Sequence, residues 1–152
     1  MLKIQNKSTK RIRVVQIVLF IIQIFLTSEP YVWGGAILTQ YKTSSFTVLD
    51  MITNIGASTG NAESDQILSV MGICYTLFLI IPIIALGFQL FDREYNLKNV
   101  VGIICSFAGV ICIMLFVGGN FLCLGSLIAL LLYLVSAFMS VMGIFARYLK
   151  TE

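Results

Sequence analysis

The feature that most constrains this chain is a run of 47 residues, Val100 to Ala146, without one charged side chain. A helix needs about 20 residues to cross a hydrocarbon layer of about 30 Å, so this run must cross a membrane twice. Its only strong break is Gly118, Gly119 and Asn120, where glycines accept the positive φ values of a tight turn. The run therefore predicts two membrane helices joined by a very short loop.

Two further uncharged runs, 67–91 and 14–26, predict the other membrane helices. The first is long enough to cross once with tilt. The second is short, and its basic start also fits a secretory signal peptide, although its end makes a poor cleavage site. It reaches about 20 residues if it includes Ile12 and an aromatic anchor at 31–33, and we expect a membrane span here.

The sequence thus predicts an all-α membrane protein in which residues 1–152 form a single antiparallel bundle of four transmembrane helices. The composition agrees, because 59% of the residues are hydrophobic and 11% are charged, whereas soluble domains have about 45–50% and about 25%. The expected spans are about 12–31, 67–91, 99–117 and 121–147, with one long outer loop over 28–66.

The basic residues are distributed very unevenly along this map. Nine of the ten lysines and arginines lie in the two tails and in the 92–99 loop, and only Lys42 lies in the 28–66 loop, which holds four acidic residues. Positively charged loops stay on the cytoplasmic side of a membrane. We therefore expect both termini in the cytoplasm and the long loop outside, in a multi-pass protein of the plasma membrane.

The long loop contains one segment with helical spacing. Apolar residues fall on a single helical stripe from Phe46 to Ile55, with Ser44 or Ser45 as a possible N-cap. The alternation over 36–48 is also compatible with an extended ribbon, so a short helix or a ribbon is expected. The residues that we expect to make outer-loop contacts are Trp33, Phe46, Leu49 and Ile52.

Small residues line one face of each of the last two spans. Such faces let membrane helices approach closely, since lipid removes most of the hydrophobic gain from burying leucine. They can pack the two spans against each other, or one of them can receive a helix of a partner. The residues concerned are Gly102, Ser106 and Gly109 on the third span, and Gly125, Ala129, Ser136, Ser140 and Gly143 on the fourth.

Gln16 and Gln23 lie seven residues apart and share one face of the first span. Amides in hydrocarbon need hydrogen-bond partners, which hydroxyl groups on other spans can supply. These residues are candidates for interhelical contacts or for a polar path across the membrane.

The sequence offers little for catalysis, because it contains no histidine and the expected spans contain no ionisable acid or base. Cys74, Cys105, Cys112 and Cys123 form no Cys-x-x-Cys motif and are expected as buried apolar residues, with Cys123 the best candidate for reactivity. The acidic residues at 63 and 65 are expected to be solvated. We expect no enzyme activity, no metal site, no cofactor and no nucleic-acid partner.

Two resemblances to known families have different extents. The whole layout, with its Trp33-Gly34 pair in one long outer loop, a short inner loop and a tight outer turn, is similar to the claudin-like four-span topology. Residues 86–114 resemble an inner loop and the following span of the drug/metabolite transporter superfamily. The small exporters of that superfamily have a membrane-embedded glutamate in the first span, where this chain has Gln16 and Gln23.

These observations favour a non-enzymatic accessory, regulatory or immunity-type subunit of a larger membrane complex. Its contacts would come from the outer loop, mainly residues 34–60, and from the small-residue face of the third span, with another membrane protein or a second copy as the partner. The alternative is a transporter or pore-forming subunit of a homo-oligomer that exports small molecules along Gln16 and Gln23.

Overall fold

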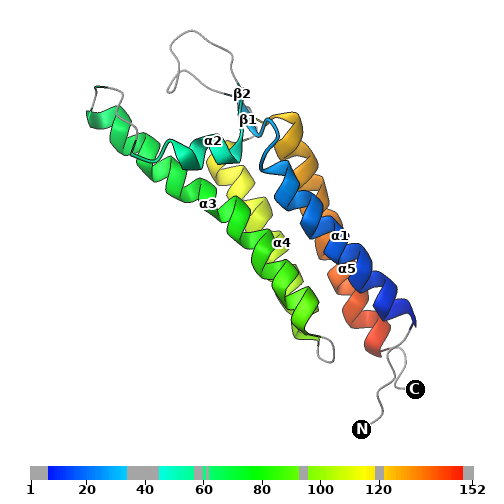
Figure 1. Cartoon of the computed structure of the whole chain (residues 1–152). Coiled ribbons are helices and arrows are strands. Elements are labelled where there is room, and N and C mark those ends of the chain that lie inside the picture. The colour runs from blue at the N-terminus through cyan, green and yellow to red at the C-terminus, as the bar shows by residue number, and fades with distance from the viewer. Residues whose placement is uncertain are drawn as a thin grey trace.

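The computed structural model describes residues 7–33, 45–56, 60, 62–92, 96–118 and 122–148. Its long helices pack side by side into an elongated bundle that carries two short strands and a short helix at one end (Figure 1). The elements are α1 (Lys7–Leu26), β1 (Val32–Trp33), β2 (Ser45–Phe46), α2 (Val48–Thr53), α3 (Ala62–Phe91), α4 (Leu97–Cys112), the π-helix η1 (Ile113–Val117) and α5 (Leu124–Tyr148).

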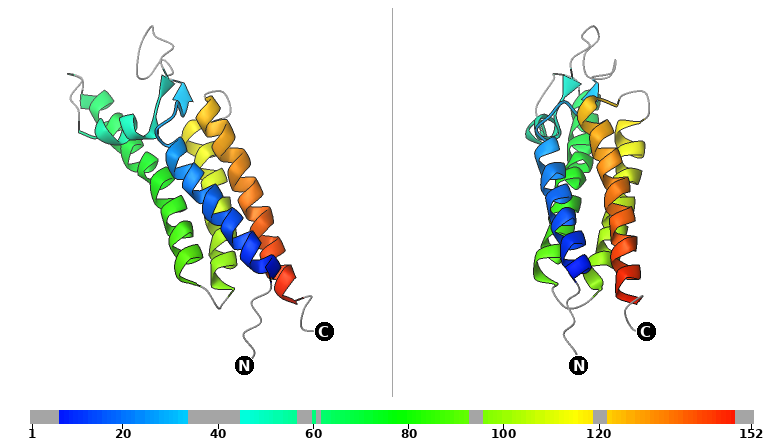
Figure 2. Two further views of the ribbon diagram at one scale, coloured as in Figure 1. Left: turned by 45° about the vertical axis from the view of Figure 1, so that its right-hand side comes forward. Right: turned by 90° about the vertical axis from the view of Figure 1, so that its right-hand side faces the viewer.

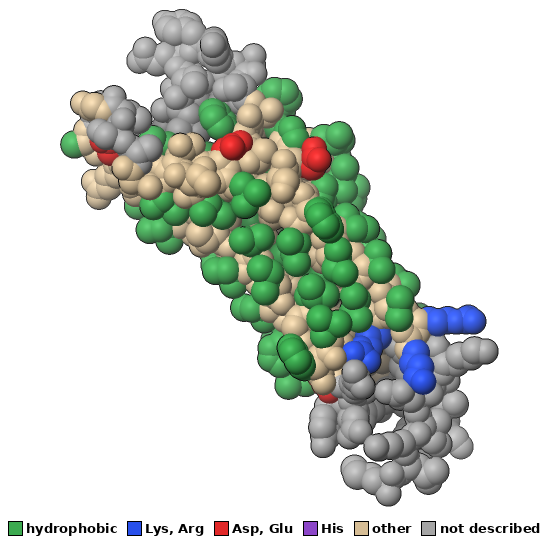
Figure 3. All heavy atoms as spheres, viewed as in Figure 1, with side chains coloured by type: hydrophobic (Ala, Val, Ile, Leu, Met, Phe, Trp, Pro, Cys, Tyr) green, Lys and Arg blue, Asp and Glu red, His purple; other side chains and the backbone are tan. Residues whose placement is uncertain are grey.

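Within the described part of the chain, three helical segments are long and apolar enough to cross a membrane: Asp65–Phe91, Leu97–Val117 and Leu124–Ala146. Apolar side chains cover the middle of the bundle, whereas the charged side chains lie near its two ends (Figure 3). The chain is therefore an integral, multi-pass membrane protein.

The four long helices form a closed ring. α1 packs against α3 and α5, and α4 packs against the same two helices (Figure 2). The strands and α2 lie at one end of the ring, which we call the cap end. The start of α1, the α3–α4 connection and the end of α5 lie at the opposite end, which we call the tail end.

The first helix differs from the expected span 12–31 at both ends. It begins at Lys7, so the basic residues Lys7, Lys10, Arg11 and Arg13 are part of the helix rather than preceding it. It ends at Leu26, and the expectation that the span continues through Tyr31 was wrong. Short-range turns follow, with Thr27 N–H donating to Ile24 O and Glu29 N–H to Leu26 O, before the chain becomes extended at β1.

The long loop carries the short helix α2 and the two-residue strands β1 and β2, whereas most of the ribbon expected over 36–48 lies outside the described residues. β1 and β2 pair antiparallel, with Val32 opposite Phe46, and Val32 also bridges to Leu122. The N-cap of α2 is Thr47 rather than the expected serines, because Thr47 and Asp50 form a reciprocal capping box. We call residues 27–33 and 45–56 the end cap; residues 34–44 of the expected loop lie outside the described residues.

Three close contacts hold the end cap onto the bundle. Gly125 N–H of α5 donates to Pro30 O at 3.0 Å. Gly72 of α3 lies directly beneath α2, and a Cβ at this position would meet the Ile55 side chain. A tilted ring contact between Tyr31 and Phe78, with centroids 5.1 Å apart, joins the end cap to the aromatic core.

The third span expected at 99–117 has an irregular end. Its last five residues, Ile113–Val117, form a π-helix that closes with Gly118 N–H donating to Ile113 O at 3.1 Å. Gly118 has φ +72°, the left-handed value expected of a glycine turn, while Gly119 and Asn120 lie outside the described residues. By contrast, α3 remains one continuous helix across Pro82.

Candidate functional site

The small-residue faces of α4 and α5 meet each other inside the bundle. A Cβ on Gly102 would lie 2.5 Å from Ser140 Oγ, and one on Gly109 would lie 2.5 Å from the Tyr133 ring. Each glycine therefore permits an approach that alanine would obstruct. Ala129 and Ser136, the other residues of the α5 face in this region, are also buried.

The two outermost glycines of the α5 face contact other parts of the same chain. A Cβ on Gly143 would lie 2.8 Å from Asn99 Oδ1 at the tail end, and one on Gly125 would lie 2.6 Å from Pro30 O at the cap end. The small-residue faces predicted from the sequence are thus occupied by contacts within the chain along the whole bundle.

A hydrogen bond joins α1 to α5 in the tail-end half of the bundle. Gln16 is completely buried and its Nε2 donates to Ser140 Oγ at 2.6 Å. Because Ser140 also faces Gly102, this point brings together α1, α4 and α5. Gln89 of α3 adds a second buried amide beside Gly102, and its Nε2 donates to Lys98 O at 3.3 Å.

Gln23 is also buried, with 3% of its surface exposed, but neither polar atom of its amide has a hydrogen-bond partner. The hydroxyl groups of Ser106 and Ser136 are buried and unpaired as well. Together with the unpaired Oε1 atoms of Gln16 and Gln89, these atoms form the polar interior of the bundle. All of these groups are neutral, and no charged residue is fully buried in the part of the chain that the structure describes.

Arg13 lies three residues before Gln16 on α1 and is bonded to the end of α3. Its Nε donates to Gln89 O at 2.6 Å and a second guanidinium nitrogen donates to Leu90 O at 2.9 Å. The guanidinium therefore satisfies carbonyl groups at the C-terminus of α3, where a cation is favoured electrostatically. This pairing makes Arg13 a tie between α1 and α3 rather than a free charge.

Gln89 and Asn99 are also buried in the interior, although neither was among the residues predicted from the sequence. Gln89 is the only amide in the uncharged run 67–91, the same signal that singled out Gln16 and Gln23. Asn99 lies three residues before Gly102 and extends the small-residue face of α4 toward the tail end. Both could have been found by treating every amide in a span as a candidate interhelical contact.

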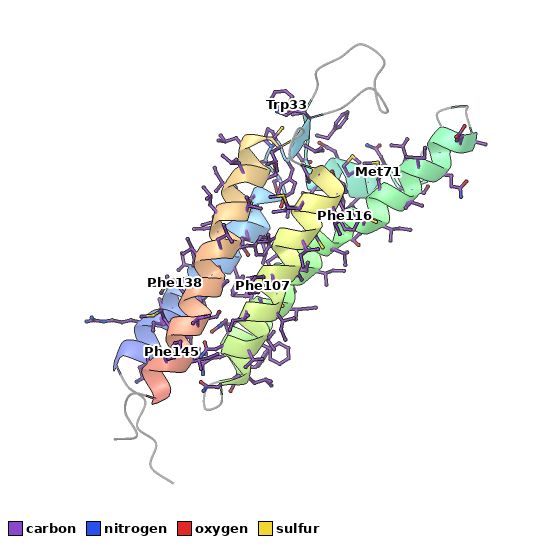
Figure 4. All side chains as sticks on the ribbon, turned by 180° about the vertical axis from the view of Figure 1, so that it is seen from behind. Trp33, Met71, Phe107, Phe116, Phe138 and Phe145 are labelled. Carbon is purple, nitrogen blue, oxygen red and sulfur yellow. The ribbon has the colours of Figure 1, made fainter. Side chains whose placement is uncertain are left out.

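The four residues expected to make outer-loop contacts divide into two pairs. Trp33 is 46% exposed and Leu49 is 40% exposed, and both lie on the end cap. Phe46 and Ile52 instead pack against the core. Trp33 projects at the cap end, away from Phe107 and Phe138 along the middle of the bundle (Figure 4).

The cysteines offer no metal site, since no group of three or more potential His, Cys, Asp or Glu ligands occurs among the described residues. Cys123, the residue expected to be most reactive, is only 4% exposed. Burial raises the pKa of its thiol, which keeps the nucleophilic thiolate scarce near neutral pH.

Cys123 is therefore expected to resist alkylation in the folded protein. In a variant that keeps only this cysteine, N-ethylmaleimide at pH 8 should react far more slowly in mild detergent than in denaturing detergent. The control is a variant whose only cysteine is introduced by Thr53→Cys at an exposed position. Its labelling should be fast in both detergents. Equal rates for Cys123 in both detergents would contradict its burial.

The Gln16–Ser140 hydrogen bond predicts a measurable coupling between α1 and α5. In a double-mutant cycle with Gln16→Leu and Ser140→Ala, the free energies of unfolding should be non-additive by about 0.6 kcal/mol, and at most about 1.7 kcal/mol. Ser126→Ala is the matched control, because the Ser126 hydroxyl bonds only within its own turn, to Cys123. Additivity in both cycles would exclude a contribution from the bond.

The interior thus combines neutral amides and hydroxyl groups with close-packed glycines, an arrangement suited to helix association and to uncharged hydrogen-bonding ligands. No protein-family model, curated protein or solved structure matches this chain.

Proposed function

We propose that this chain is a non-enzymatic four-span membrane protein that acts as an accessory, regulatory or immunity-type subunit through its end cap. The observation that carries the proposal is that the small-residue faces are used within the bundle, whereas Trp33 and Leu49 of the end cap are exposed. Exposed aromatic residues are frequent anchors of protein interfaces. The partner we propose is a larger complex in the same membrane, and claudin-like topology remains part of this proposal.

The fourth span in this proposal is α1. Its residues 14–26 are uncharged, and Gln16 and Phe20 face the bundle interior with no exposed surface. Val14 and Phe25 are exposed, as expected of positions that face lipid. A helix with these two faces, packed between α3 and α5, fits a membrane span better than a removable leader.

The orientation that we propose places the tail end in the cytoplasm and the end cap outside, in the plasma membrane. Lys10, Arg11 and Arg13 belong to the start of α1 at the tail end, whereas the acidic residues Glu29 and Asp50 belong to the end cap. Blue side chains gather at the tail end and most of the red ones at the cap end (Figure 3). This separation follows the preference of basic loops for the cytoplasmic side.

The test is co-purification from the native membrane. A tagged protein extracted in mild detergent should retain a stoichiometric partner, and Trp33→Ala combined with Leu49→Ala should reduce its recovery at least tenfold. The matched control is Phe107→Ala with Phe138→Ala, which removes comparable exposed apolar surface from the middle of the bundle. Recovery of the chain alone, or equal loss with both double variants, would refute contact through the end cap.

The second candidate function is a transporter or pore-forming subunit, and the unpaired amides of the interior favour it. In this case purified protein in liposomes should support flux of small uncharged molecules, and Gln16→Leu with Gln23→Leu should abolish it. Absence of flux from folded protein would remove this candidate and leave the first proposal intact.

A further inference from the structure

The buried polar atoms without partners lie on helices that surround one region of the bundle. Among the described residues these atoms are Gln16 Oε1, Gln23 Nε2, Gln23 Oε1, Gln89 Oε1, Ser106 Oγ and Ser136 Oγ, and each belongs to a residue that is at least 97% buried. A buried polar group without a hydrogen bond is costly in any protein, and within the hydrocarbon layer bulk water cannot compensate. Six such atoms in one interior call for a common cause.

The spacing along the helices places these atoms at neighbouring levels. Gln16 and Ser140 lie at one level, because their side chains are bonded, and Gly102 lies beside them. Four residues toward the cap end on α4 and on α5, a rise of about 6 Å, lead to Ser106 and Ser136. These two unpaired hydroxyl groups therefore lie at a shared second level.

Gln23 lies at a third level, seven residues and about 10 Å from Gln16 along α1. The same seven-residue step leads from Gly102 to Gly109 on α4 and from Ser140 to Tyr133 on α5. Gly109 and Tyr133 are in direct contact, which shows that equal steps on these helices reach equal levels. The unpaired atoms thus follow the axis of the bundle from Gln16 to Gln23.

The chemistry of these atoms limits what they can bind. Three of them are amide carbonyl oxygens, two are hydroxyl oxygens, and only Gln23 Nε2 is purely a donor. Acceptors in excess require a ligand that donates hydrogen bonds. The absence of charge from the described interior disfavours ions, and oxygens spread over about 10 Å cannot enclose one dehydrated cation.

We propose that the interior between α1, α4 and α5 binds a short file of small, uncharged, hydrogen-bond-donating molecules at Gln16, Ser106, Ser136 and Gln23. Water is the smallest ligand of this class, and a small polyol has the same chemistry. Buried waters commonly satisfy such groups through two to four hydrogen bonds each. The site is independent of the end cap, so loss of partner binding leaves it intact.

The test observes the Gln23 side-chain amide directly. Protein labelled with ¹⁵N-glutamine in lipid nanodiscs should show cross-relaxation between the Gln23 amide protons and a ligand, with the signal assigned by its loss in Gln23→Met. A cross-peak at the water frequency in polyol-free buffer identifies water, and one that appears only after glycerol is added identifies a polyol. The exposed residue Gln66 at the cap end supplies the positive control.

A second variant separates binding from mere exposure of the amide. Ser136→Val replaces an unpaired hydroxyl group with one methyl group, adds a second, and should remove at least half of the Gln23 cross-peak intensity, while leaving that of Gln66 unchanged. A folded protein in which Gln66 gives a cross-peak and Gln23 gives none under either condition would overturn the proposal. So would a Gln23 cross-peak that Ser136→Val leaves at full intensity.

Discussion

Gly109→Ala is expected to lower the free energy of unfolding by about 1–3 kcal/mol, with Gly109→Leu costing more. The added Cβ would lie within 2.6 Å of three atoms of the Tyr133 ring, and Tyr133 is fully buried and cannot move into solvent. The helices must therefore separate or the ring must leave its position. Reversible unfolding in mixed micelles of mild and denaturing detergent measures the change.

Gly87→Ala is the matched control for this substitution. Gly87 also lies within a long helix, but a Cβ at this position meets nothing within 4 Å. Alanine there should stabilise the helix by about 0.5–1 kcal/mol, because glycine loses more backbone freedom on folding. Equal effects of the two substitutions would mean that the α4–α5 contact does not depend on Gly109. If the contact does depend on Gly109, Tyr133→Leu should partly rescue the stability of Gly109→Ala.

Gly72→Leu is expected to release the end cap while the four-helix bundle persists. The new side chain would occupy the place of Ile55 and approach Met51 O, whose distance from a Cβ is only 2.9 Å. α2 has only six residues and cannot remain helical without its packing. Amide hydrogen exchange across 48–54 should accelerate by at least about tenfold, which corresponds to about 1.4 kcal/mol of lost local stability.

Gly87→Leu, at an open position of the same helix, should leave exchange in the end cap unchanged. If partner recovery depends on the end cap, Gly72→Leu should reduce it as strongly as the Trp33 and Leu49 substitutions. Rapid exchange throughout α4 and α5 in Gly72→Leu would instead indicate that the end cap and the bundle unfold together.

The positions of the long helices follow from local sequence information. Uncharged runs of sufficient length predicted α3, α4 and α5, and helical spacing predicted which faces of α4 and α5 are small. The limits of α1 were harder to predict, because the helix includes basic residues before the apolar run and Tyr31 belongs to the end cap. Within the end cap, Val32 pairs with Phe46 and with Leu122. These partners are distant in the sequence, and no local pattern predicts them.

Only part of the interior could be predicted, because partners on other helices are not encoded by local spacing. The spacing of Gln16 and Gln23 placed both on one face of a helix, but it could not say that Ser140 would pair with Gln16 and leave Gln23 without a partner. The contact between Gly109 and Tyr133 also depends on the register of two helices. The π-helix at 113–117 had no recognisable sequence signal, because its residues are ordinary apolar helix residues.

The bond from Gly125 to Pro30 has a consequence for the order in which the protein can mature. During synthesis the segment after α1 leaves the ribosome long before the start of α5 does. Val32 and Pro30 therefore cannot form these contacts until Leu122 and Gly125 have been synthesised. The end cap can close only after the last span has begun to insert. A complete end cap thus marks a chain whose last span has at least begun to insert, and a partner that recognises it would not bind the chain before that stage.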